Sequence, residues 1–185
     1  MRRPGSVDAF MKPLSNDTIK FSVYADNWFA MYINGKLVAT DSIDFMPHNA
    51  VSFDILPEYP MTIAIIAKDN ADPKTGLDYG NKIGDGGIIV KMGEGTITNA
   101  KWRAKSFFYG LINGDTRNPK VKYDPIPADW FAVNFNDSKW GQAKEYSERE
   151  IRPMEAFRTA DFSGAKFIWS DDLLLLTILV CTLRP

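Results

Sequence analysis

The stretch Tyr24–Val38, with the sequence YADNWFAMYINGKLV, shows most directly which class of structure this chain forms. The Asp26-Asn27 pair predicts a turn, because short Asp and Asn side chains can hydrogen-bond to their own backbone. Residues 28–33 then predict a strand. Asn34-Gly35 predicts a tight hairpin, since both positions tolerate positive φ. Residues 36–40 return as the next strand, so the stretch predicts two antiparallel strands.

Similar patterns lie on both sides of this hairpin. Alternation of polar and apolar residues over Thr18–Ala25 and Ala50–Leu56 predicts strands. The nearly continuous apolar run Met61–Ala67 is typical of a strand that is buried on both faces. Further strands are expected at residues 88–92, 96–98, 101–109, 130–135 and 165–170 and in the final apolar run, with short helical turns at 137–143 and 147–151. Many short strands separated by turns predict an all-β antiparallel sandwich.

Composition and charge limit the organisation and the partners. The chain has 185 residues, 45% of them hydrophobic and 24% charged, which predicts one globular domain over residues 1–185. Residues 1–15 and 173–185 are expected to be irregular or truncated ends, although 173–181 also fits a final buried strand. Residues 1–10 lack the pattern of a signal peptide. The net charge of −1 without a basic stripe predicts no nucleic-acid partner, and residues 173–181 are too short for a membrane span.

Three segments, in this order, carry a resemblance to a known family: residues 24–38, then Phe135–Ala143 (FNDSKWGQA), then Ala165–Trp169 (AKFIW). Together they resemble the galactose-binding-like jelly-roll modules that accompany the catalytic domains of many glycoside hydrolases. The resemblance covers the start and the end of the chain, whereas residues 47–127 match by strand pattern alone. It implies a jelly-roll sandwich, a carbohydrate ligand, a structural calcium ion and a place in a larger extracellular or cell-surface protein. The motif residues themselves are expected to build the sandwich, with Trp140 holding a capped turn against it.

The most unusual stretch is the polar loop of residues 68–87, KDNADPKTGLDYGNKIGDGG. Calcium takes about 6–8 oxygen ligands, and this loop supplies many carboxylates and amides. Its spacing differs from the EF-hand pattern, and the alternative is a solvated loop whose Asp, Asn and Gly residues form turns. The candidate metal ligands are Asp69, Asp72, Asp78 and Asp85.

The same loop carries most of the candidates for binding a sugar. Flat aromatic rings pack against the C–H face of a sugar, while amides and carboxylates bind its hydroxyl groups. Aromatic residues in strands, such as Trp102 and Trp169, are expected in the core, whereas those in loops, such as Tyr79 and Tyr59, are better placed to contact a ligand. The candidate ligand-binding residues are Asp69, Asn70, Asp72, Tyr79, Tyr59 and Trp28.

Candidates for catalysis are few. An acidic pair held ~5–10 Å apart could hydrolyse a glycoside, and His48 could serve as a base for a serine, but no Gly-x-Ser-x-Gly motif is present. The candidate catalytic residues are Asp69, Asp85 and His48. Three functions remain open: a non-catalytic carbohydrate-binding module that uses loops at one end of the sandwich, a small hydrolase of glycans or esters, and a structural or interaction domain. Cys181 is expected to be a buried, unreactive thiol.

Overall fold

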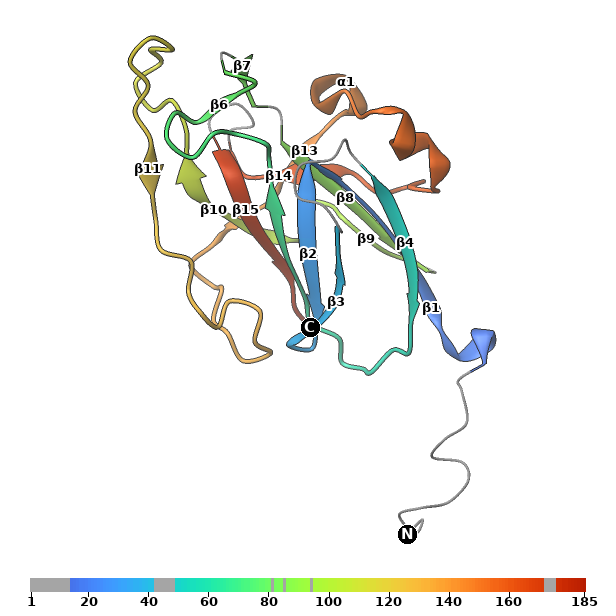
Figure 1. Ribbon diagram of the computed structural model, residues 1–185. Coiled ribbons are helices and arrows are strands. Elements are labelled where there is room, and N and C mark those ends of the chain that lie inside the picture. The colour runs from blue at the N-terminus through green and yellow to red at the C-terminus, as the bar shows by residue number, and fades with distance from the viewer. Residues whose placement is uncertain (1–13, 42–48, 81, 85, 94, 172–175) are drawn as a thin grey trace.

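The computed structural model describes residues 14–41, 49–80, 82–84, 86–93, 95–171 and 176–185. Two antiparallel sheets pack face to face, with very little helix (Figure 1). The predicted all-β sandwich is therefore confirmed. None of the helices in the described part of the chain is long and apolar enough to span a membrane.

The first sheet has the strand order β13-β14-β8-β1-β4, and β9 pairs with β8. All of its pairs are antiparallel, and β1 is an inner strand that hydrogen-bonds to both β8 and the edge strand β4. The bounds of the strands are β1 Ile19–Asp26, β4 Ala50–Ile55, β8 Gly87–Met92, β9 Thr96–Ile97, β13 Lys144–Tyr146 and β14 Phe167–Trp169.

The second sheet has the order β11-β10-β15-β5-β2-β3, and β12 pairs with β10. β5 is buried along nearly its whole length, as its apolar sequence predicts. A separate two-stranded hairpin, β6–β7, lies within the polar loop. The bounds are β2 Trp28–Ile33, β3 Lys36–Thr40, β5 Ile63–Lys68, β6 Leu77–Asp78, β7 Lys82–Ile83, β10 Arg103–Tyr109, β11 Lys122–Tyr123, β12 Gly141–Gln142 and β15 Leu176–Leu183.

The hairpin between β2 and β3 forms as the sequence predicts. Asn34 and Gly35 both have positive φ, at 49° and 78°. The Asn34 side chain also reaches the chain ahead of β5, since its Nδ2 donates to the Glu58 carbonyl at 2.9 Å and its Oδ1 accepts from the Thr62 N–H at 2.8 Å. The turn therefore fixes the end of the sandwich at which β5 begins.

Two of the predicted elements differ from the structure. Residues 130–135 form successive turns rather than a strand, because Trp130 and Phe135 pack inward onto a small aromatic cluster with Trp140. Residues 137–143 hold one turn, closed by the Trp140 N–H on the Asp137 carbonyl at 2.8 Å, and then form β12 rather than a helix. The helical turn expected at 147–151 is present as α1 Glu148–Ile151, and two 3-10 turns occur as η2 Ser15–Asp17 and η3 Glu155–Thr159.

The C-terminal apolar run forms β15, which lies between β10 and β5 inside the second sheet. Residues 176–183 are therefore a strand rather than an irregular end, because pairing on both edges satisfies their backbone. Residues 1–13 and 172–175 lie outside the described residues. Cys181 in this strand is fully buried, as expected.

The burial of Cys181 leads to a first prediction. Desolvation raises the pKa of its thiol well above the ordinary value, and the thiolate is the reactive form. We expect the folded protein not to react with a thiol-specific reagent such as Ellman's reagent at mildly alkaline pH. After denaturation with guanidinium chloride, one thiol per chain should react, since the sequence holds a single cysteine. Fast labelling of the native protein would contradict this packing.

Candidate functional site

Several strand ends that carry polar residues meet at one end of the sandwich, named here the loop end. β1 finishes at Asp26, which pairs with Gly87 at the start of β8. β2 starts at Trp28, which pairs with Lys68 at the end of β5. Asp41 follows β3, and its N–H donates to the Phe29 carbonyl at 3.0 Å. The loop end thus comprises residues 26–28, 41, 68–80, 82–84 and 86–87, around the β6–β7 hairpin in Figure 1.

Hydrogen bonds fasten the polar loop to the turn between β1 and β2. The Asn27 N–H donates to the Lys68 carbonyl at 2.7 Å. In return the Asn70 N–H donates to Asn27 Oδ1 at 2.7 Å and to Asp69 Oδ1 at 2.6 Å. Asp69 also packs closely on Gly84, since a Cβ at Gly84 would lie 1.8 Å from Asp69 Oδ2. The loop therefore has a fixed position where it leaves β5.

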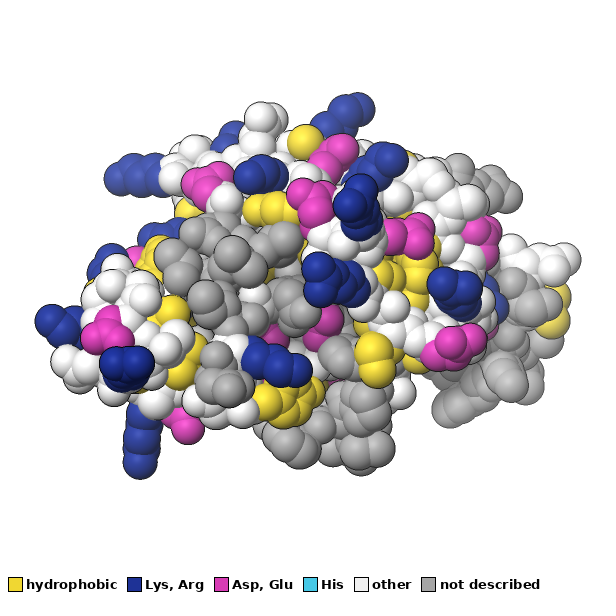
Figure 2. Space-filling model, turned by 90° about the horizontal axis from the view of Figure 1, so that it is seen from above, with side chains coloured by type: hydrophobic (Ala, Val, Ile, Leu, Met, Phe, Trp, Pro, Cys, Tyr) yellow, Lys and Arg dark blue, Asp and Glu magenta, His cyan; other side chains and the backbone are white. Residues whose placement is uncertain are grey.

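Four carboxylates at or beside this end are buried: Asp26, Asp41, Asp69 and Asp78 expose 4–7% of their surface. Asn27 is buried as well, whereas Asn70 is half-buried. In Figure 2, which looks down on the loop end, acidic side chains are visible in the middle of the face between Lys and Arg side chains. By their burial, Asp26, Asp41, Asp69 and Asp78 belong to the packed end of the sandwich and not to a solvated rim.

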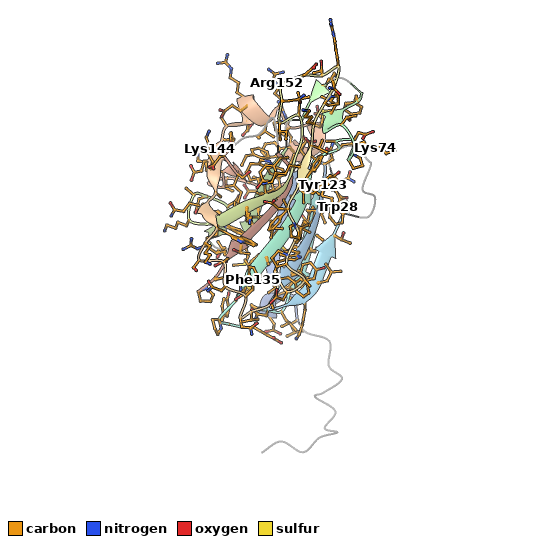
Figure 3. All side chains as sticks on the ribbon, turned by 90° about the vertical axis from the view of Figure 1, so that its left-hand side faces the viewer. Trp28, Lys74, Tyr123, Phe135, Lys144 and Arg152 are labelled. Carbon is orange, nitrogen blue, oxygen red and sulfur yellow. The ribbon has the colours of Figure 1, made fainter. Side chains whose placement is uncertain are left out.

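Two aromatic rings lie at the loop end, and each has a lysine beside it. Trp28 is half-buried, its Nε1 donates to the Asp41 carbonyl at 3.1 Å, and Lys68 Nζ lies 4.8 Å from its ring centroid. Tyr79 is 66% exposed, and Lys82 Nζ lies 5.7 Å from its ring. Figure 3 shows Trp28 on the same side of the molecule as Lys74 of the polar loop, and Lys144 on the other. One ring is thus anchored and the other projects into solvent.

Asn70 and Tyr79 flank a backbone bridge in the polar loop. Ala71 pairs with Asp78 in an isolated antiparallel bridge, and Asn70 and Tyr79 are the next residues on the two strands of this pair. The Asn70 side-chain amide makes no hydrogen bond to any residue in the described part of the chain. An exposed ring and an amide with available donors and an acceptor therefore belong to the same bridged part of the polar loop.

Tyr59 does not lie with the other predicted ligand-binding residues. It precedes β5, whereas the loop end follows β5, so the length of the strand separates it from Asp69 and Asn70. At that opposite end the Tyr59 ring is 70% exposed and borders a shallow hollow of about 570 Å³ with Asn16, Lys20 and Thr96. The prediction grouped Tyr59 with residues of the polar loop because both lie in segments that connect strands. These two segments precede and follow β5, so they lie at opposite ends of the sandwich.

The predicted metal ligands are only partly assembled. Asp72 is exposed, and its Oδ1 accepts from the backbone N–H groups of Lys74 at 2.6 Å and Thr75 at 3.2 Å, so it stabilises its own turn. Asp85 lies outside the described residues. Among those that are described, no three His, Cys, Asp or Glu side chains form a group that could hold a metal ion. They do not by themselves fit the calcium site that the resemblance implies, and calcium stays a prediction.

Of the three candidate catalytic residues, the structure describes only Asp69. His48 and Asp85 lie outside the described residues, and Asp69 is buried against Gly84.

The sequence analysis did not predict that Asp26 and Asp41 lie at the loop end. A usable signal was present, since Asp26 precedes the first strand of the predicted hairpin and Asp41 follows the second. Antiparallel pairing places two such positions at one end.

Comparison with known proteins does not indicate a function for this site. No protein-family model matches the chain, and no curated protein or solved structure is significantly similar to it. The functional argument therefore rests on the residues of the site.

Proposed function

We propose that this chain is a non-catalytic carbohydrate-binding module of the galactose-binding-like jelly-roll type, which binds a glycan at its loop end. The observation that carries the proposal is the exposed Tyr79 ring, which follows the Ala71–Asp78 bridge just as the available Asn70 amide precedes it. In a module of this kind the site would belong to a larger extracellular or cell-surface protein.

The chemistry of a sugar suits this pair. One face of a pyranose ring is a patch of C–H groups, which packs on an aromatic ring, while its hydroxyl groups need donors and acceptors around that patch. Tyr79 supplies the ring, and Asn70 supplies two N–H donors and a carbonyl acceptor. The charged group of Lys82 lies near the same ring and can donate to a hydroxyl. A polar ligand can thus exchange its bonds to water for bonds to the protein.

The loop is also prepared for binding before a ligand arrives. The Asn70 backbone is held by Asn27 and Asp69, and Gly84 packs on the Asp69 carboxylate. A site that is already ordered loses less conformational entropy on binding. The buried acids of the loop end support this order, so their role in the proposal is to position the loop and not to contact the sugar.

We expect Tyr79→Ala and Asn70→Ala each to weaken glycan binding by about tenfold or more, because each removes one half of the contact. The parent protein is first screened on an array of galactose-, glucose-, xylose- and mannose-based oligosaccharides. The strongest ligand is then titrated calorimetrically against each variant. Tyr59→Ala is the matched control, because it removes an equally exposed tyrosine at the opposite end.

Two results would contradict the proposal. One is the absence of binding to any glycan on the array, which favours a structural or interaction domain. The other is binding that Tyr59→Ala weakens while Tyr79→Ala does not, which moves the site to the opposite end. The same oligosaccharides are incubated with the protein and examined for cleavage, since turnover would replace the binding module with a hydrolase.

A further inference from the structure

A second concave surface is lined by residues none of which belongs to the loop end of the proposed glycan site. The segment that contains α1 and η3 runs along the first sheet (Figure 1) and leaves a groove of about 620 Å³ beside β14. The groove is lined by residues of α1, of η3, of the chain from 160 to 166 and of the start of β14. None of the sequence motifs pointed to it.

The floor of the groove is aromatic. Phe157 of η3 stacks on Phe162, with ring centroids 5.1 Å apart and planes within 6° of parallel. It also contacts Phe167 at 5.3 Å and Tyr24 at 5.6 Å. Phe162 and Phe167 are buried, whereas Phe157 is only half-buried and lines the groove. A rigid ring surface is therefore accessible from the groove.

Three cations surround this floor. Arg149 comes from α1, Arg158 from η3, and Lys166 from the residue before β14, and all three are exposed lining residues. None of their side chains has a hydrogen bond or ion pair to a residue that the structure describes. Guanidinium groups bind carboxylates with two parallel hydrogen bonds, which single ammonium groups do not match.

The acidic residues of the groove leave an excess of positive charge. Asp161 is engaged by Lys91, whose Nζ lies 2.5 Å from Asp161 Oδ2 and 2.6 Å from Ser163 Oγ. This hydrogen bond, with that from the Ser163 N–H, holds the pKa of the Asp161 carboxyl well below its ordinary value. Glu148 is the other acid in the lining, and its carboxylate makes no ion pair with the described residues. The groove therefore has three available cations and one available acid.

We propose that this groove binds an acidic saccharide, of the class of uronate-bearing oligosaccharides. The C–H face of a uronate ring packs on Phe157, and its carboxylate accepts hydrogen bonds from Arg149 and Arg158, with Lys166 adding charge. A neutral sugar would leave the two guanidinium groups without a bound partner. The site is independent of the loop end, and either proposal can fail without the other.

The test is a calorimetric titration of the whole chain with trigalacturonate and with galactotriose, its neutral counterpart. We expect trigalacturonate to bind and galactotriose to bind the groove at least about tenfold more weakly. The double variant Arg149→Gln, Arg158→Gln should weaken trigalacturonate binding by about tenfold or more. The matched control is Arg117→Gln, which removes an exposed arginine in the loop before β11 and should leave binding unchanged.

A second pair of measurements separates this site from the loop end. Tyr79→Ala should leave trigalacturonate binding as it is, and added salt should weaken that binding because the contact is ionic. The inference is overturned if trigalacturonate does not bind, if the double arginine variant binds it as tightly as the parent, or if Tyr79→Ala abolishes the binding. Equal affinity of the groove for galactotriose would also overturn it.

Discussion

Replacing Asp137 with alanine is expected to lower the free energy of unfolding by about 3–5 kcal/mol, the range seen when one partner of a buried ion pair is removed. Asp137 is buried, and its Oδ2 accepts hydrogen bonds from Arg184 Nε at 2.8 Å and from the Thr182 hydroxyl. Without the carboxylate, a largely buried guanidinium and a buried hydroxyl both lose their acceptor.

The effect should extend to the loop over 130–137, because Arg184 also holds that loop. Its Nη1 donates to the carbonyls of Ala132 at 2.9 Å and Val133 at 3.0 Å, and its Nη2 to that of Trp130 at 3.2 Å. Asp137 thus orients the side chain that connects the end of β15 to these turns. The measurement is urea denaturation followed by fluorescence, with the free energy taken by linear extrapolation.

Asp129→Ala is the matched control for Asp137→Ala, since Asp129 is an exposed acid just before that loop and its side chain makes no hydrogen bond or ion pair to the described residues. Its expected change is within about 0.5 kcal/mol. Asp137→Asn keeps an acceptor and removes the charge, so its loss should fall between the two. A loss below about 1 kcal/mol for Asp137→Ala would show that the pair contributes no more than an exposed salt bridge.

The second large effect is expected for Trp102→Ala, which should lower the melting temperature by roughly 10 °C or more. Trp102 is fully buried in the main core, just before β10, and its Nε1 donates to the Ile97 carbonyl at 3.0 Å. Removing a buried tryptophan leaves a cavity that the neighbouring strands cannot close, at a cost of about 3–5 kcal/mol. The Ile97 carbonyl also loses its donor.

The matched controls for Trp102→Ala vary the size and the exposure of the lost ring. Trp102→Phe keeps an aromatic ring in the core and should lose about 1–2 kcal/mol. Tyr59→Ala removes an aromatic ring that is 70% exposed, so its melting temperature should stay near that of the parent protein. A scanning calorimetry profile in which Trp102→Ala melts within ~3 °C of the parent would contradict the assigned burial.

The fold was predictable to the extent that local patterns govern it. Alternating apolar residues, the Asn34-Gly35 turn and the apolar run of β5 each act within a few residues, and the structure has strands where they predict them. The strand predicted at residues 130–135 was wrong, because apolar side chains at these positions do not require a strand. The aromatic side chains of this segment pack in a cluster with Trp140, and they do so from a series of turns.

The candidate site was predictable only in outline. The polar loop was recognised from its composition, and Asp69, Asn70 and Tyr79 do lie at one end of the sandwich. The contribution of Asp26 and Asp41 and the separation of Tyr59 follow from strand pairing. A polar composition gives no direction in space, so it could not place these residues relative to one another.

An antiparallel β-sandwich follows from the sequence alone, because turn propensities and side-chain alternation are properties of neighbouring residues. Which distant residues meet follows only from the folded arrangement of the strands. Asp137 and Arg184 are 47 positions apart, and Asn70 reaches Asn27 over 43. Such contacts depend on how the two sheets are ordered and packed, and so does the cationic groove beside β14. No local pattern encodes them, since their energy appears only once the chain has folded.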